Sequence, residues 1–246
     1  MPHEHLSSHI PDFLPQQSLE WAQSFAKDLE TARKIQYPPN MQVLFAFGCK
    51  DQRKNEERLK MTAEILIKTA LTKRAKTQSF AFRNNSAPSQ ELNDYLPLFV
   101  FNGTKTENNQ LKTFMKTPYW QIPQDKVLIF DEFCPKDITT PKEHENTKDQ
   151  IESFYSHISD VASPLFGVNE IGILSHAAHF VRIPFYLEEV NKKYQTRLDY
   201  KPFYWIFRVR ENENFRAELE KELAKLKTSA QQKALAPNPY QDMLIA

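Results

Sequence analysis

The feature that most constrains the fold is a recurring order of three kinds of segment: a short apolar run, a polar turn and a stretch with helical periodicity. The apolar runs have the length of buried strands and lie at 43–47, 98–101, 127–130 and 171–174. Repeated strand–helix units form parallel sheets that helices cover on both faces, joined by right-handed crossovers. We therefore expect an α/β chain with a three-layer α/β/α, Rossmann-like fold and a mostly parallel sheet.

The helices expected around these strands are marked by apolar residues that recur every three or four positions. They fall within 18–32, 59–70, 111–115, 151–161 and 180–190. A further strand is expected at 203–207, followed by a charged helix near 212–228. Residues 73–95 show little periodicity, which predicts a surface excursion with a short strand at 80–82.

The domain organisation follows from these segments. Residues 1–40 are expected to form an N-terminal extension with the leading helix, 41–230 the α/β domain, and 231–246 a C-terminal tail. A chain of 246 residues has room for one such domain with its extensions.

Composition excludes several classes of function. The chain has 32 Lys and Arg against 31 Asp and Glu, so no broad nucleic-acid surface is expected. The glycines, Gly48, Gly103, Gly167 and Gly172, are too far apart for a dinucleotide-binding turn or an NTPase phosphate loop. Two cysteines are too few for a disulfide framework, and no apolar stretch is long enough to cross a membrane. We expect a cytoplasmic protein without a membrane partner.

Polar residues follow the predicted strands at the points where ligands bind in open parallel sheets. The segments are Gly48-Cys49-Lys50, Asn102-Gly103, Asp131-Glu132 and Ser175 to His179. Gly48, Lys50, Asn102, Gly103 and Ser175 are therefore candidate ligand-binding residues. Cys49 is a conceivable nucleophile, although a small buried residue is the simpler interpretation.

The last of these segments is the strongest cluster. If the following helix starts near Ala177, His179 lies in its first turn and Arg182 one turn later. Imidazoles and a guanidinium at a helix N-terminus favour a phosphate or carboxylate ligand. His176 and His179 are the candidate catalytic acid/base residues, and Arg182 is the candidate charge clamp. The alternative is a pair of satisfied core histidines and a surface arginine.

Acidic residues on neighbouring loops allow two interpretations. Glu107, Asp131 and Glu145 could hold a divalent cation or supply a general base. We favour pairing of these carboxylates with Arg58 and Arg182, and assign no metal site. A zinc site at His176 and His179 with Asp131 is disfavoured because paired helical ligands normally lie four residues apart.

Several motifs resemble the YdcF/SanA/ElyC family of bacterial proteins of poorly known function. The segment from Leu174 to Arg182 resembles the family's TSxYHxxRA motif. Phe47-Gly48 followed by Glu57-Arg58-Leu59 resembles its first glycine turn and ERL helix start. The other matches are Phe101-Asn102-Gly103 with Glu107, similar to its SGG…E segment, and Ile122-Pro123 with Glu145-Asn146, similar to its VP…EN segment.

The resemblance spans roughly residues 41–190 and implies a soluble, YdcF-like protein. It carries over Gly48, Arg58, Asn146 and Arg182, among the residues above, as ligand-binding positions. It also makes S-adenosylmethionine a candidate ligand. We expect an anionic, nucleotide-like or phosphorylated small molecule at the strand ends, bound by a hydrolase or transferase. The alternative is a non-catalytic ligand-binding or regulatory protein.

Overall fold

The computed structural model describes residues 37–48, 51–83, 92–133, 140–144, 146–176, 179, 182–195, 199–205, 221–222 and 224–225. The expected leading helix at 18–32 and the tail at 231–246 lie outside these residues, as do Lys50 and Glu145. Most of the charged helix expected near 212–228 lies outside them too.

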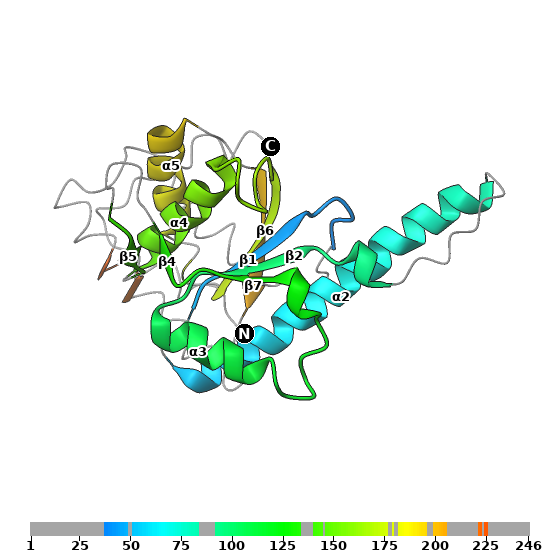
Figure 1. Cartoon of the computed structure of the whole chain (residues 1–246), viewed down its shortest axis with the longest axis horizontal. Coiled ribbons are helices and arrows are strands. Elements are labelled where there is room, and N and C mark those ends of the chain that lie inside the picture. The colour runs from blue at the N-terminus through cyan, green and yellow to red at the C-terminus, as the bar shows by residue number, and fades with distance from the viewer. Residues whose placement is uncertain are drawn as a thin grey trace, which may run out of the picture.

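A parallel sheet forms the centre of the described chain, which has mixed α/β structure as expected (Figure 1). Its strands are β1 (Val43–Ala46), β2 (Leu98–Phe101), β3 (Val127–Ile129), β6 (Glu170–His176) and β7 (Asp199–Trp205). They lie in the order β3-β2-β1-β6-β7, and every neighbouring pair is parallel. Pro202 is tolerated in β7 because that strand lies at the sheet edge. The strands expected at 43–47, 98–101, 127–130 and 171–174 are present, and the strand expected at 203–207 corresponds to β7, which begins at Asp199.

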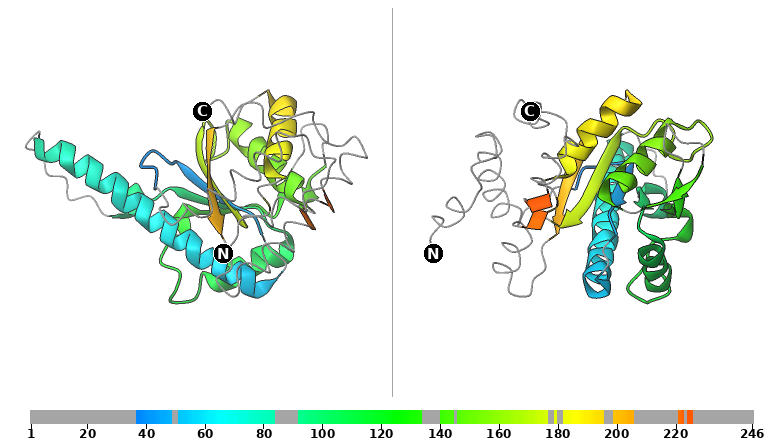
Figure 2. Two further views of the ribbon diagram at one scale, coloured as in Figure 1. Left: turned by 180° about the vertical axis from the view of Figure 1, so that it is seen from behind. Right: turned by 90° about the vertical axis from the view of Figure 1, so that its left-hand side faces the viewer.

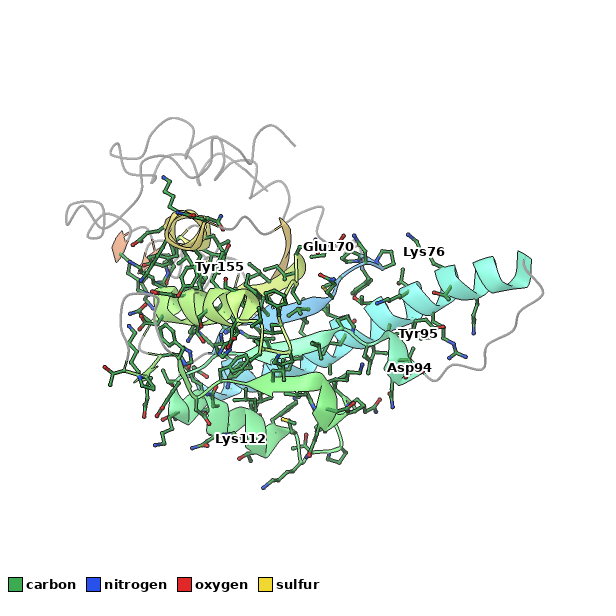
Figure 3. The ribbon with its side chains drawn as sticks, turned by 45° about the horizontal axis from the view of Figure 1, so that its top comes forward. Lys76, Asp94, Tyr95, Lys112, Tyr155 and Glu170 are labelled. Carbon is green, nitrogen blue, oxygen red and sulfur yellow. The ribbon has the colours of Figure 1, made fainter. Side chains whose placement is uncertain are left out.

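Two apolar clusters flank the sheet because successive side chains of a strand point to opposite faces. In β1, Leu44 belongs to the cluster that includes residues of α2 (Gln52–Arg83) and α3 (Lys105–Phe114). Its neighbour Phe45 belongs to the cluster that includes residues of α4 (Thr147–Ser159) and α5 (Ile183–Tyr194). The Phe45 ring stacks on Phe154 of α4, with 4.9 Å between centroids. Tyr155 lies between α4 and α5 (Figure 3). Its hydroxyl donates a hydrogen bond to Asn191 Oδ1.

A small antiparallel pair, β4 (Glu132–Phe133) and β5 (Lys142–Glu143), follows β3. It lies in the connection between β3 and α4. The short 3-10 helices η3 (Leu92–Tyr95) and η4 (Gln124–Lys126) precede β2 and β3. Among the described helices, none has a stretch both long and apolar enough to cross a bilayer.

The surface excursion expected at 73–95 is wrong over its first part. Residues 73–83 continue α2, so the strand expected at 80–82 is helical instead. No glycine or proline occurs from Ile65 to Arg83, and nothing in that stretch ends a helix. The extra turns project from the sheet as an arm in Figures 1 and 2. Figure 3 shows Lys76 on this arm, with Asp94 and Tyr95 of η3 near the helix.

The helix expected to start near Ala177 also differs. α5 begins at Ile183, with Arg182 at its N-cap and Pro184 in its first turn. Proline is tolerated in a first turn but not in a helix interior, which explains the later start. His179 therefore lies in the connection before α5. α4 ends earlier than expected, at Ser159. Val161, expected to be its last apolar residue, falls beyond the helix and is 78% exposed.

Candidate functional site

Two groups of residues, most of them with polar side chains, lie at the carboxyl ends of the central strands. The first, the β2 tip group, consists of Asn102, Gly103, Glu107, Asn108 and Asp131. The second, the β6 tip group, consists of Ser175, His179, Arg182 and Glu222. Together they contain most of the predicted site residues, but their internal bonding differs.

Asn108 ties the ends of β2 and β3 together. Its side-chain oxygen accepts a hydrogen bond from the Gly103 N–H at 2.9 Å, and its Nδ2 donates to Phe130 O at 3.1 Å and Asp131 Oδ1 at 2.8 Å. A Cβ on Gly103 would lie 2.8 Å from the Glu107 Cβ, so only glycine fits this turn. Asn108 was not predicted. The sequence signal that could have identified Asn108 is its spacing of three residues from Leu111. This spacing puts Asn108 on the same, buried face of α3.

Glu107 caps the start of α3. Its Oε2 accepts from the Thr104 N–H at 2.8 Å, and the Thr104 hydroxyl accepts from the Glu107 N–H, which completes a capping box. The carboxylate also fills the space beside Gly48, because a Cβ there would lie 2.2 Å from Glu107 Oε2. The structure therefore brings Glu107 and Gly48 together, with the carboxylate serving the helix end.

Arg58 is fully buried and holds the end of β1 in place. Its Nη1 donates to the carbonyl of Gly48 at 2.9 Å and to the carbonyl of Phe47. The sequence predicted carboxylate partners for Arg58, whereas these acceptors are backbone oxygens. A charge-assisted bond of this kind fixes the turn that follows β1.

Asp131 points to α3. Its Oδ2 lies 3.0 Å from Lys112 Nζ, and its Oδ1 accepts from Asn108. Partial burial raises the pKa of Asp131, but the hydrogen bonds from Asn108 and Lys112 and the charge of Lys112 outweigh this and lower it overall. In the described part of the chain, no three His, Cys, Asp or Glu side chains are grouped so that they could hold a metal ion.

Asn102 and Asn146 connect the sheet to α4. Asn102 is fully buried, and its Nδ2 donates to Gln150 O and Ser153 Oγ, each at 3.2 Å. Asn146 is the N-cap of α4, where its Oδ1 accepts from the Asp149 N–H at 3.0 Å. Both predicted ligand-binding amides thus make structural bonds.

Two further histidines, which the sequence did not single out, lie near this edge. His144 is 2% exposed and stacks on Phe133, with 5.1 Å between ring centroids. Burial lowers the pKa of His144 to about 4, although the Gly103 backbone and the Asp149 charge oppose the shift. His157 stacks on Phe130, and burial lowers its pKa as well. His144 follows a polar loop without periodicity, so no sequence signal marked it as buried.

The β6 tip group is built around a buried carboxylate. Ser175 Oγ lies 3.2 Å from His179 Nδ1, and His179 Nε2 lies 3.6 Å from Glu222 Oε1. The Arg182 guanidinium forms an ion pair with Glu222, and Lys225 Nζ lies 2.6 Å from Glu222 Oε1. The structure thus brings together the predicted residues Ser175, His179 and Arg182.

Glu222 is the residue that sequence analysis missed here. It is fully buried and comes from the charged C-terminal segment, 46 positions after His176, the last residue of β6. The available signal was its position directly before Leu223, an apolar residue of the charged helix expected near 212–228. His176 ends β6 opposite Trp205 of β7, and its side chain lies outside the described part of the structure.

Comparisons with known proteins add no identification. No protein-family model matches the chain, and neither a curated protein nor a solved structure matches it. The YdcF-like resemblance and the ligand that it implies stay predictions, carried by the motifs alone.

Proposed function

We propose that this chain is a YdcF-like protein that binds an anionic, nucleotide-like or phosphorylated small molecule at the carboxyl edge of its sheet. In this proposal the protein is a hydrolase or transferase that uses His179 as its acid/base. The observation that carries the proposal is the β6 tip group, in which an imidazole is held between a hydroxyl and a buried carboxylate. S-adenosylmethionine remains a candidate ligand by resemblance.

The strand order supports this location. From β1 the chain continues to β2 on one side, and from β6 it continues to β7 on the other. In a three-layer, Rossmann-like arrangement, ligands bind in the crevice where the strand order reverses. Here that point lies between the end of β1, marked by Gly48, and the end of β6, marked by Ser175.

Charge and helix capping at the β6 tip also favour an anion. Among the described residues here, Arg182 and Lys225 carry two positive charges against the single carboxylate of Glu222, which leaves a positive surplus in this set. Arg182, at the N-cap of α5, makes no side-chain cap hydrogen bond. The first turn of α5 also contains no acidic residue, whereas that of α3 contains Glu107.

The geometry of His179 suits proton transfer. Its side chain is 22% exposed, so a ligand can reach it. Nδ1 lies 3.2 Å from Ser175 Oγ, which orients the ring, and Nε2 faces the Glu222 carboxylate at 3.6 Å. In this proposal the imidazole exchanges a proton with the ligand, and the Glu222 carboxylate stabilises the imidazolium that forms.

One observation favours the rival function, a ligand-binding protein without turnover. Ser175 and Glu222 are both fully buried, as expected for a network that only positions Arg182 and the chain around it. In that case the β6 tip group binds the ligand without converting it, and His179 contributes to the affinity for the ligand alone.

The test combines native mass spectrometry of the purified protein with turnover assays on phosphate esters, nucleotides and S-adenosylmethionine. We expect a retained anionic ligand or a turned-over compound, with turnover lost in His179→Gln and kept in His157→Gln. His157 is the matched control because its ring stacks on Phe130 and takes no part in the β6 tip group. Binding without turnover would support the rival function, and equal turnover in both variants would contradict a role for His179.

A further inference from the structure

A cavity of about 470 Å³ lies between α2 and α3 and includes none of the residues of the β6 tip group. Its lining begins at Gln52 and Thr106, near the starts of the two helices, and extends to Tyr119. The side chains of Leu59 and Phe114, both buried, contribute its apolar part. The volume falls within the ~300–1,000 Å³ typical of small-molecule sites. We call this cavity the α2–α3 groove.

Four amide side chains contribute to the polar lining of the groove, beside the hydroxyls of three threonines. The amides belong to Gln52, Asn55, Asn109 and Gln110. Asn55 is fully buried: its Nδ2 donates to Gln110 Oε1 at 2.8 Å, while its Oδ1 has no hydrogen-bond partner among the described residues. An amide both donates and accepts hydrogen bonds, as a hydroxyl does. This lining therefore matches a ligand that carries several hydroxyl groups.

Charge in the groove is balanced. Among the described residues of the lining, the one carboxylate, on Glu56, accepts a hydrogen bond from Gln52 Nε2 at 3.0 Å. The one ammonium group among them, on Lys60, lies 5.1 Å from the centroid of the Tyr119 ring. Neither an anion nor a cation gains from this balance, in contrast to the positive surplus at the β6 tip. The groove thus suits an uncharged ligand.

Tyr119 supplies an open aromatic surface in the lining. Tyr119 is 68% exposed, and Lys60 Nζ is the ammonium that the described residues place over its ring. A flat apolar ring beside amide groups can pack against the C–H face of a sugar ring while the amides bind its hydroxyls.

We propose that the α2–α3 groove is a second ligand site, which binds a neutral sugar through Tyr119 and the amides of Asn109 and Gln110. This site does not depend on the function proposed for the β6 tip. Asn109 is exposed, so its substitution tests the groove without opening the core.

The test is saturation-transfer NMR on the full chain with glucose, N-acetylglucosamine and cellobiose, with adenosine as a nucleobase-bearing comparison. We expect at least one sugar to bind. Tyr119→Ala should weaken that binding at least ~5-fold, about the effect of losing one aromatic packing partner. Asn109→Ala should weaken it by a smaller factor. Phe166→Ala is the matched control, because Phe166 is an exposed aromatic residue outside the groove lining and should leave affinity unchanged.

Three results would overturn the proposal. The first is no saturation transfer to any of the three sugars at millimolar concentration. The second is equal weakening by Tyr119→Ala and Phe166→Ala, which would place the sugar elsewhere. The third is binding of adenosine alone that depends on Tyr119, which would make the groove a base-stacking site instead.

Discussion

The two tip groups occupy the same edge of one sheet, yet their charged residues are used in different ways. In the β2 tip group, Glu107 completes a capping box and Asp131 bonds to Asn108 and Lys112. In the β6 tip group, a single buried carboxylate is shared by two cations and a partly exposed imidazole. The comparison teaches that acidic residues at strand ends belong to the scaffold when they cap a helix.

Helix capping explains why an anion should bind at the β6 tip group rather than at the β2 tip group. The capping box puts the Glu107 carboxylate at the start of α3, where it opposes a second negative charge. The N-cap residue of α5, Arg182, is a cation that makes no side-chain cap hydrogen bond, and the first turn of α5 contains no acidic residue. The β2 tip group is therefore expected to act as scaffold, and the β6 tip group as the ligand site.

The largest expected effect follows removal of the buried carboxylate. Glu222→Ala leaves the largely buried Arg182 guanidinium without its partner, which should cost about 3–5 kcal/mol of unfolding free energy. Thermal or denaturant melts measure the loss. Replacing both partners, in Glu222→Leu with Arg182→Met, should recover much of it. A single variant that melts like the wild type would show that the ion pair contributes little.

A second effect, of up to about 3 kcal/mol, concerns His144 and acidic pH. Its pKa falls from about 6.5 in the unfolded chain to about 4 in the folded one, so the unfolded chain binds more protons between these values. Stability should thus be retained above the unfolded pKa and decline as the pH falls toward 4. Denaturant melts across this range should show a shallower decline for His144→Gln. An unchanged slope would mean that His144 is not buried as described.

A third effect, about 1–3 kcal/mol, tests the contact between Gly48 and Glu107. Gly48→Ala introduces a methyl group that would meet the Glu107 carboxylate at 2.2 Å, so it should destabilise the wild type. In a Glu107→Ala background the nearest carboxylate atoms are gone, and the same substitution should cost clearly less. A double-mutant cycle measures this coupling. Strict additivity would contradict the close approach of the two residues.

Much of the fold was predictable because its strands are short apolar runs buried on both faces. Val43–Ala46 and Leu98–Phe101 show this pattern in sequence and structure. The length of α2 was not predictable from apolar periodicity, because its projecting turns carry mostly polar residues. The absence of glycine and proline from 65–83 was the signal that the helix continues. The later start of α5 was signalled by Pro184, a residue that the sequence analysis did not weigh.

The candidate site was predictable where its members are close in sequence. Ser175 and His179 lie four residues apart at a strand end, and the structure places them in contact. Glu222 reaches them from a distant segment, which only tertiary packing decides. The role of Glu107 was likewise hidden, because a carboxylate three residues after Thr104 serves equally well as a cap or as a ligand.

The most direct test of the account is a thermal-shift titration with nucleotides, phosphate esters and S-adenosylmethionine on three forms of the chain. They are the wild type, His179→Gln and Thr104→Val, the last of which disturbs the capping box of the β2 tip group. We expect an anionic ligand to stabilise the wild type and Thr104→Val equally and to lose most of its effect on His179→Gln. A ligand that stabilises His179→Gln fully but fails with Thr104→Val, or a panel that stabilises none of the three, would contradict the assignment of scaffold and site.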